Sequence, residues 1–254
     1  MTAPREEWSL DTRHVGRRVQ VYDAVGSTND VAAALASDPA NGGVVVLADA
    51  QTAGRGQYGR RWLTTPGTSV LMSVLIFPPE PLRRPALLTA WAAVAVGEAV
   101  LESTGLQAKI KWPNDVLLHG RKVCGILIEQ GRGTVVGIGL NVNQQPADFE
   151  SAGLPDATSL AAATGAWFDT REVARRLITH LDAGYDLLLR GEVGTLEACW
   201  KRRVGLLGRH VAAELHDGST VGGRLREMSF DGIELDQGGG AVRVVPPEAV
   251  RHLG

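Results

Sequence analysis

The stretch "IKWPNDVLLHGRKVCGILIE", residues 110–129, decides the fold of this chain. Pro113 ends one predicted strand, because proline cannot donate a hydrogen bond to a sheet ladder. Residues 115–118 and 122–129 then have the pattern of a β-hairpin that turns at His119–Gly120. We therefore expect an antiparallel sheet around this stretch.

The same stretch sets Lys111 beside Trp112 in an apolar run. Lys109 and Lys111 are two residues apart, so they share one face of a strand. On an edge strand both would extend into solvent. The neighbouring Ile110 and Val116 favour a buried sheet instead, where an unpaired lysine is costly and an anionic partner is expected. Both readings stay open on strand physics alone.

Outward from this stretch, apolar periodicity predicts a mixed α/β region. The helix at 85–104 is expected to bury one stripe that contains Leu87, Trp91, Val94 and Leu101. The other predicted elements are strands at 19–23, 44–48, 69–77, 108–112 and 134–142 and helices at about 27–37 and 171–190.

The pattern changes after about Gly205. Four short runs, "RHVAAEL", "TVGGRLREM", "GIELD" and "AVRVVP", alternate with Gly/Asp turns, which is typical of a small all-β barrel. We therefore predict an α+β chain with two domains, residues 1–205 and 206–254.

Composition limits the function. The 254 residues carry 26 basic and 28 acidic side chains, a formal net charge of −2, so no global attraction to nucleic acid is expected. Only about twenty residues precede the first predicted strand, too few for a helix-turn-helix module. No secretory signal or uninterrupted apolar span of membrane length is visible. The two lone cysteines indicate a reducing compartment, and we expect a cytoplasmic protein without membrane association.

The motif "GSTND", residues 26–30, opens the first predicted helix. Ser27 is a good N-cap, and Asp30 complements the helix dipole. Alternatively, Ser27, Thr28 and Asn29 offer hydroxyl and amide groups to a polar ligand at the helix start.

The segment "ADAQTAGRGQYGRRW", residues 48–62, combines glycines with arginines. Glycines let backbone N–H groups approach an anion closely, and arginine binds phosphate or carboxylate in a bidentate manner. The spacing fits neither a P-loop nor a dinucleotide fingerprint. A solvated basic turn is the alternative to an anion-binding loop that closes over a ligand.

In "VVGIGLNVN", residues 135–143, Gly137 and Gly139 interrupt a strand, which often marks the close approach of a ligand or another backbone. Asn141 or Asn143 could pair with the polar edge of a base. No Ser-His-Asp order or metal-ligand cluster stands out, and the six histidines are scattered.

In this order, "GSTND", "QTAGRGQYGRRW", "KWPNDVLLHGRKVCGILIE" and "GIGLNVN" closely resemble the biotin protein ligases, and the resemblance runs from about residue 20 to the end. It implies a mixed-sheet catalytic domain of the biotin/lipoate ligase type followed by a small SH3-like β-barrel. It also implies the monofunctional group, which lacks the N-terminal DNA-binding domain. The implied activity converts biotin and ATP, with Mg²⁺, to biotinyl-5′-adenylate and then biotinylates a lysine of a biotin carboxyl carrier protein or domain.

The resemblance also implies roles for residues. Lys111 would be the protonated charge between the biotin carboxylate and the α-phosphate, and Arg55 would hold the same two anions from the other side. The protein alone would fix no metal. The biotin site would comprise Ser27, Thr28, Asn29, Gln51, Gly54, Arg55, Gly56, Gln57, Lys111 and Gly125. The adenylate site would comprise Arg55, Gln57, Arg60, Trp62, Lys111, Asn114 and Asn141, with Asp115 near the phosphates.

One position departs from the family pattern. Many relatives carry a second arginine where this chain has Gln57, which brings no charge, and Arg60 is the candidate to compensate. Two alternatives stay open. A lipoate- or octanoate-transferring enzyme would share the fold but would not need the polar set around Ser27, and a biotin-responsive regulator would need a DNA-binding module or a strongly basic face.

Overall fold

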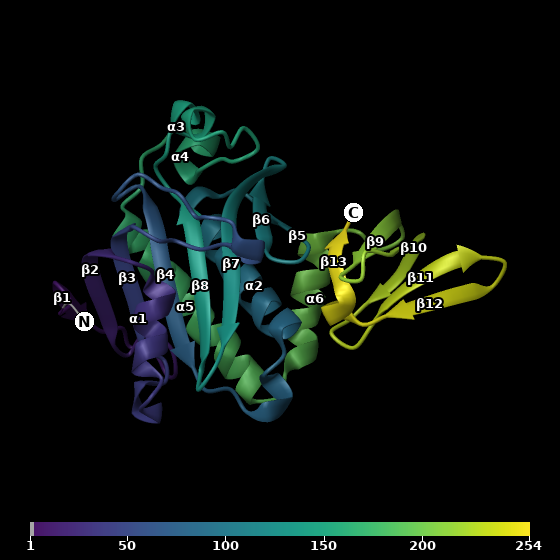
Figure 1. Ribbon diagram of the computed structural model, residues 1–254, viewed down its shortest axis with the longest axis horizontal. Coiled ribbons are helices and arrows are strands. Elements are labelled where there is room, and N and C mark those ends of the chain that lie inside the picture. The colour runs from purple at the N-terminus through teal and green to yellow at the C-terminus, as the bar shows by residue number, and fades with distance from the viewer. Residues whose placement is uncertain (1–2) are drawn as a thin grey trace.

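The structure is a computed structural model that describes residues 3–254. Its larger part is an eight-stranded mixed sheet in the order β1-β2-β3-β4-β8-β7-β6-β5 (Figure 1). Only β2 and β3 run parallel to each other within the described residues, and β1 and β5 form the two edges. The strands are β1 (Glu6–Trp8), β2 (Val19–Val25), β3 (Val45–Gln51), β4 (Ser69–Ile76), β5 (Lys109–Lys111), β6 (Asp115–Leu118), β7 (Arg121–Gln130) and β8 (Thr134–Asn141).

Helices cover the two faces of this sheet unequally. The long helices α2 (Pro85–Thr104), α5 (Thr170–Leu189) and α6 (Val193–Val204) lie behind it, and α1 (Thr28–Leu35) lies in front (Figure 1). Buried side chains accordingly form a large cluster behind the sheet and a small one under α1. The short helices α3 (Pro146–Ser151) and α4 (Leu160–Thr164) sit at one end. Much of the front face is therefore left uncovered by helix.

Helix α2 differs from its prediction. It is buried on nearly all sides and not along one stripe, because α5 and α6 pack over it and the sheet lies beneath it. Its length and mean hydropathy would suffice for a membrane span, but 67% of its most apolar window is buried inside the fold. Helix α2 is thus the core helix of this domain.

The remaining predicted elements of the first region are confirmed. The strands and the helices at 27–37 and 171–190 begin and end within a few residues of the predicted positions. The hairpin turns at His119 and Gly120, both with positive φ (49° and 78°). Elements β1, α3, α4 and α6 were not predicted.

The C-terminal residues form a second, antiparallel sheet of five strands in the order β12-β11-β10-β9-β13. Its strands are β9 (His210–Leu215), β10 (Thr220–Met228), β11 (Ile233–Gly238), β12 (Ala241–Val245) and the unpredicted β13 (Val250–Leu253). In residues 3–254 no ladder joins β12 to β13, so hydrogen bonds do not close a barrel. The all-β unit is confirmed, and the boundary at residue 205 stays a prediction.

Aromatic side chains join the two sheets. Trp200 of α6 stacks on Phe230 of the C-terminal unit, with ring centroids 4.9 Å apart. Trp112, at the end of β5, donates from its indole N–H to the carbonyl of Val250 at 2.9 Å. These contacts place β13 beside the edge of the main sheet.

Candidate functional site

A cavity of about 570 Å³ lies on the front face of the main sheet, between α1, the segment joining β3 to β4, and the C-terminal sheet. This volume lies within the range of small-molecule sites, about 300–1,000 Å³. Every residue predicted for the site lines it except Gly54, which is buried and whose carbonyl accepts from the backbone N–H of Trp62 at 3.0 Å. The lining residues among those predicted are Ser27, Thr28, Asn29, Gln51, Arg55, Gly56, Gln57, Arg60, Trp62, Lys111, Asn114, Gly125 and Asn141.

Glycines form the floor of the cavity. Gly125 of β7 lies opposite Gly139 of β8 in the ladder. A Cβ at Gly139 would stand 2.4 Å from the Trp62 ring, and one at Gly125 would stand 2.8 Å from it. The Trp62 indole can therefore lie directly against the two central strands, as the strand glycines indicated.

The start of α1 serves both readings of "GSTND". Ser27 is the N-cap, and its hydroxyl accepts from the backbone N–H of Asn29 at 3.3 Å. The backbone N–H of Thr28 donates to the side-chain carbonyl of Gln51 at 2.7 Å. The cap thus places three polar residues, with Gln51, at one wall of the cavity.

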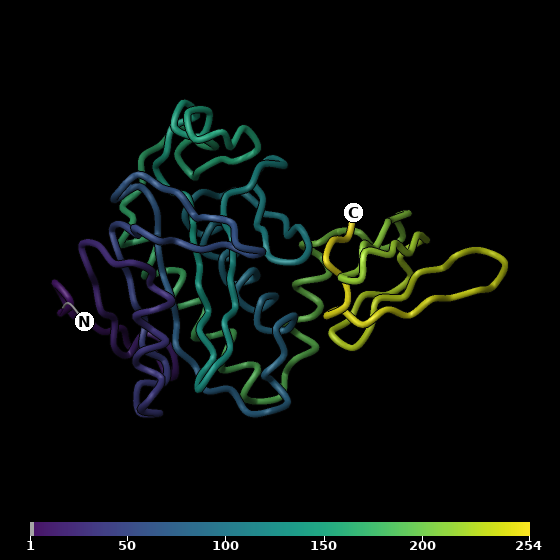
Figure 2. Tube along the Cα trace, viewed as in Figure 1, coloured from purple at the N-terminus to yellow at the C-terminus, as the bar shows by residue number. Residues whose placement is uncertain are grey.

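The glycine-rich segment crosses the front of the sheet toward the C-terminal strands (Figure 2). It is a narrow hairpin in which Arg55 and Arg61 form an antiparallel bridge, and the N–H of Gly56 donates to the carbonyl of Arg60 at 2.7 Å. Tyr58, at the tip, has a left-handed backbone with φ 58°. The segment therefore lies over the cavity, in the position expected of a loop that closes over a ligand.

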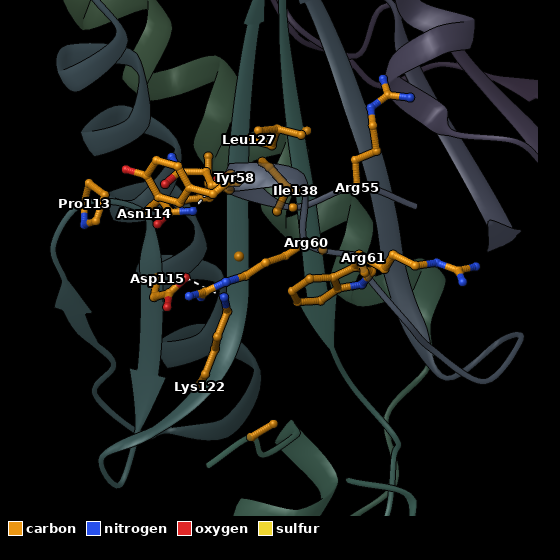
Figure 3. Close-up of a pocket in the computed structure, with 18 of the residues that line it drawn as sticks. Arg55, Tyr58, Arg60, Arg61, Pro113, Asn114, Asp115, Lys122, Leu127 and Ile138 are labelled. Atoms are coloured by element: carbon orange, nitrogen blue, oxygen red, sulfur yellow. Dashed lines mark hydrogen bonds and ion pairs between the residues drawn. The ribbon is translucent and has the colours of Figure 1, made fainter. Parts of the chain in front are cut away.

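The side chain of Arg55 is held by two carboxylates. Its guanidinium donates to both oxygens of Asp30, at 2.7 and 2.9 Å, and to Glu129 at 3.1 Å. The Arg55 hydrogen bond holds the pKa of Asp30 below its usual value, and the two carboxylates raise the pKa of Arg55. Figure 3 shows Arg55 pointing away from Arg60 and Lys122. In this arrangement the charge of Arg55 is already matched.

Lys111 is exposed, so of the two readings that the sequence left open, the edge-strand reading is confirmed and the buried one is not. Period-2 alternation puts Ile110 and Trp112 into the core and leaves Lys109 and Lys111 exposed on the edge strand β5. Lys111 lines the rim of the cavity, and no ion pair engages it within residues 3–254.

A second lysine, which the sequence interpretation missed, lies on the floor of the cavity. Lys122 of β7 forms an ion pair with Asp115, Nζ to Oδ1 2.6 Å, and its Nζ is 5.7 Å from the centre of the Trp62 ring. A Cβ at Gly125 would stand 3.4 Å from the same Nζ. No local signal marked it, because residues three apart on a regular strand point to opposite faces. The register of β6 and β7 shifts between Val116 and Leu117, and both Lys122 and Gly125 line the cavity.

Arg60 lines the same cavity as Lys122. Figure 3 shows the Arg60 side chain extending toward Asp115 and Lys122, whereas Arg61 extends the opposite way. Arg60 and Lys122 therefore both line the cavity, and Lys122 is the one paired with Asp115.

Two predicted nucleotide-binding asparagines are engaged by the protein. The amide of Asn114 donates to the carbonyl of Ile126 at 2.8 Å, across the end of the hairpin. Asn141 is buried, donating to the carbonyl of Thr158 at 3.0 Å and accepting from Gln144 at 3.1 Å. Both asparagines line the cavity, but their amide groups are already hydrogen-bonded to other residues of the protein.

Further lining residues come from segments without a sequence signal. Phe149, Leu154 and Ala157, around α3, form an apolar wall. Arg251 and His252 of β13 and Glu214 of β9 line the side facing the C-terminal sheet. Only the tertiary structure brings these segments to the cavity.

The loop tip contacts the C-terminal sheet. The guanidinium of Arg251 lies 5.1 Å from the centre of the Tyr58 ring, and the rings of Tyr58 and His216 are 6.3 Å apart. The C-terminal sheet thus holds the loop over the cavity from one side. Within the described residues, no three His, Cys, Asp or Glu side chains are grouped as a metal site.

Comparison with known proteins agrees with this geometry. The profile of the Biotin/lipoate A/B protein ligase family matches residues 21–143. The chain is 37% identical to a biotin--[acetyl-CoA-carboxylase] ligase of Mycobacterium tuberculosis over 98% of this chain and 96% of that protein. It is 35% identical to a bifunctional ligase/repressor of Bacillus subtilis over 85% of this chain and 68% of that protein. A biotin protein ligase from Aquifex aeolicus, solved in complex with biotin and ATP, superposes with a TM-score of 0.77 at 26% identity and covers 93% of this chain and 97% of that one.

Proposed function

The chain belongs to the biotin protein ligase family, and we propose that it carries out both steps of biotin transfer in the cavity on the main sheet. In the first step a carboxylate oxygen of biotin attacks the α-phosphorus of ATP, and the bond to the β-phosphate oxygen breaks to release pyrophosphate. In the second step the amine of an acceptor lysine attacks the acyl carbon, an amide forms, AMP leaves and the amine loses a proton.

One observation carries this proposal: a neutral polar wall and two cationic side chains line one cavity, with glycines between them on its floor. Thr28 and Gln51 form the wall, and Lys122 and Arg60 supply the charges. Biotin matches this order, because its bicyclic urea can bind the polar wall while its carboxylate reaches the cations. A linear acyl chain gives the polar wall nothing to bind, so this arrangement favours biotin over lipoate or octanoate.

The charge between the reacting anions is the role for which the sequence singled out Lys111. We assign it to Lys122, because this lysine lies on the floor with Asp115, whereas Lys111 is exposed at the rim. Arg60 supplies the charge that Gln57 does not bring. Neutralising two anions that must meet requires cations that stay protonated, not a general base.

The nucleotide would lie toward Trp62 and the apolar wall of Phe149 and Leu154. An indole face and two apolar side chains suit a purine ring. Asn141 can donate a hydrogen bond to the purine only if its bond to the carbonyl of Thr158 breaks. Mg²⁺ would arrive with ATP, since magnesium is bound through substrate phosphates and one or two carboxylates. Asp115 is the candidate carboxylate for this metal, because it lines the cavity beside Lys122, with which it forms an ion pair.

The acceptor would be the lysine of a biotin carboxyl carrier domain, as the name of the Mycobacterium tuberculosis relative suggests for that protein. The C-terminal sheet lines the cavity through Arg251 and His252, which supports a role in completing the site and in holding the loop. Cytoplasmic location and the absence of nucleic-acid and membrane partners stay predictions.

The test is transfer itself. Purified protein, ATP, Mg²⁺, biotin and a recombinant carrier domain should give a carrier heavier by one biotinyl group, located on one lysine by mass spectrometry. Omitting ATP or replacing the acceptor lysine with arginine should remove the product. Transfer of a lipoyl or octanoyl group under the same conditions, without transfer of biotin, would assign the alternative function.

A further inference from the structure

Trp112 is a residue of the stretch at 110–129 to which the proposed function gives no role. It directly follows β5 and is buried. Its indole N–H donates to the carbonyl of Val250 in β13 at 2.9 Å, so a buried hydrogen bond links the edge of the main sheet to the C-terminal sheet. Because a hydrogen bond has a preferred distance and angle, it fixes β13 more closely than apolar packing alone would.

Other contacts hold other parts of the C-terminal sheet. Phe230, between β10 and β11, stacks on Trp200, and Arg84, just before α2, pairs with Asp231 at 2.8 Å. Near β13 itself, the ion pair from Arg84 to Glu248 is longer, at 3.6 Å, and partly exposed, so it restrains the strand less. We therefore expect the sheet to stay attached without the Trp112 bond, but with β13 less closely placed.

The strand β13 leads to the glycine-rich loop. Arg251 directly follows Val250, and its guanidinium lies 5.1 Å from the centre of the Tyr58 ring at the loop tip. Consecutive Cα atoms are about 3.8 Å apart, so a shift of Val250 moves Arg251 with it. A chain of contacts thus joins Trp112, through β13, to the loop tip.

The loop tip needs support from its surroundings. Tyr58 has a left-handed backbone with φ 58°, which costs free energy for a residue with a bulky side chain. Such a conformation persists where neighbouring groups hold it in place. The Tyr58 ring lies beside Arg251 and His216, and both belong to the C-terminal part of the chain. A displaced β13 would therefore weaken the support of the loop.

We propose that Trp112 is a positioning residue for the glycine-rich loop: its bond to β13 sets Arg251 against Tyr58 and so keeps the loop over the cavity before any ligand binds. The inference goes beyond the proposed function, because it concerns the closure of the site and not the reaction in it. Trp112 also lines the cavity, so a test without ligand is needed to separate positioning from contact with a ligand.

The test is limited trypsin digestion of the full chain without biotin or ATP, with the cleavage sites located by mass spectrometry. Trp112→Phe keeps an aromatic ring and removes the N–H. We expect cleavage at the loop arginines, Arg55, Arg60 and Arg61, to become about threefold faster or more, the effect of one lost hydrogen bond on a local opening equilibrium.

Trp91→Phe is the matched control. Trp91 is also buried, and its indole N–H donates to the carbonyl of Leu181 at 3.0 Å, but this bond joins α2 to α5 behind the main sheet. Both variants lose the same kind of bond, so both should unfold at a lower urea concentration than wild type. Loop cleavage in Trp91→Phe should nevertheless stay within about 1.5-fold of the wild-type rate.

A double-mutant cycle tests whether Trp112 acts through the loop tip. If it does, Trp112→Phe should change the rate of loop cleavage less than about 1.5-fold in a Tyr58→Ala background, in which the contact with Arg251 is already lost. A substitution that loosened the whole fold would raise the rate by the same factor in both backgrounds.

Two results would overturn the proposal: an unchanged rate of loop cleavage in folded Trp112→Phe, or the same fold-change with and without the Tyr58→Ala substitution. If Trp112→Phe fails to fold, benzothienylalanine at position 112 keeps both fused rings and removes only the N–H. The same rise of about threefold is then expected, and an unchanged rate would count against the proposal. Because no ligand is present, a failure of the proposed function would leave these outcomes unaffected.

Discussion

Lys122 and Asp115 form a 2.6 Å ion pair on the floor of the cavity, with the lysine nitrogen 5.7 Å from the centre of the Trp62 ring. The pair holds a cation where the floor glycines leave space for a ligand. A negative group arriving there would compete with Asp115 for the same lysine. This pair is the reason that we propose Lys122, and not the exposed Lys111, for the central charge.

Replacing the two lysines separately tests this assignment. Lys122→Ala should lower the rate of adenylate formation by about 10²–10³-fold, the usual loss for one fixed electrostatic donor. Lys111→Ala, the matched control, should lower it less than about tenfold, since an exposed charge is screened. Rates come from single-turnover assays with radiolabelled ATP. A larger loss in Lys111→Ala would return the central role to that residue.

The floor glycines predict a steric effect on the adenylate. Gly139→Ala would place a methyl 2.4 Å from the Trp62 ring and force the indole off the sheet. We expect the dissociation rate of biotinyl-adenylate to rise about tenfold or more, as expected from loss of an aromatic contact worth about 1–3 kcal/mol. Gly131→Ala, at a turn where a Cβ meets nothing within 4 Å, is the control. Equal dissociation rates in both variants would show that Trp62 does not retain the adenylate.

The contact between Tyr58 and Arg251 predicts that the C-terminal sheet restrains the loop. Tyr58→Ala should release the loop from the C-terminal sheet, and limited trypsin digestion should cleave at its arginines at least about threefold faster, because a cation–π contact contributes about 0.5–1 kcal/mol at an exposed site. Tyr58→Phe keeps the ring and should be cleaved at the wild-type rate. Identical cleavage of all three proteins would contradict the restraint.

The pairing of Arg55 with Asp30 predicts a dependence of stability on pH. Because the hydrogen bond from Arg55 lowers the pKa of Asp30, the pair stabilises the fold at pH values above the ordinary pKa of an aspartate. That contribution is lost as the pH falls through the lowered pKa. Both side chains are partly exposed, so the effect should stay below about 1 kcal/mol.

Urea denaturation measures this effect. The difference in free energy of unfolding between wild type and Asp30→Asn should be present at pH 7 and shrink progressively below about pH 4. A difference that stays constant down to about pH 3 would assign the effect to something other than the ionised pair.

Local sequence patterns predicted most of the secondary structure correctly. The cap at Ser27, the turn at His119–Gly120 and the apolar face of α5 each depend on neighbours within a few residues, and each is confirmed. Helix α6 was missed because its residues mix charge with Gly194 and a single buried tryptophan, Trp200, and its burial depends on contact with α2.

What the sequence left open or missed at the site also depends on contacts between residues far apart in the chain. The apolar run around Lys111 left its burial open, and a strand that is buried on one face only points alternate residues outward. The pairing of Arg55 with Glu129 spans 74 residues, and the hydrogen bond from Ser73 to Asn29 spans 44. Such contacts are set by strand order, which no local pattern reveals.

The most direct test of the central claim is ligand-dependent exchange of radiolabelled pyrophosphate into ATP, measured with biotin, lipoate and octanoate in parallel. It reports acid activation alone, before any carrier protein is needed. The cavity on the main sheet predicts rapid exchange with biotin and background exchange with both linear acids. Exchange with lipoate or octanoate but not with biotin would contradict the account.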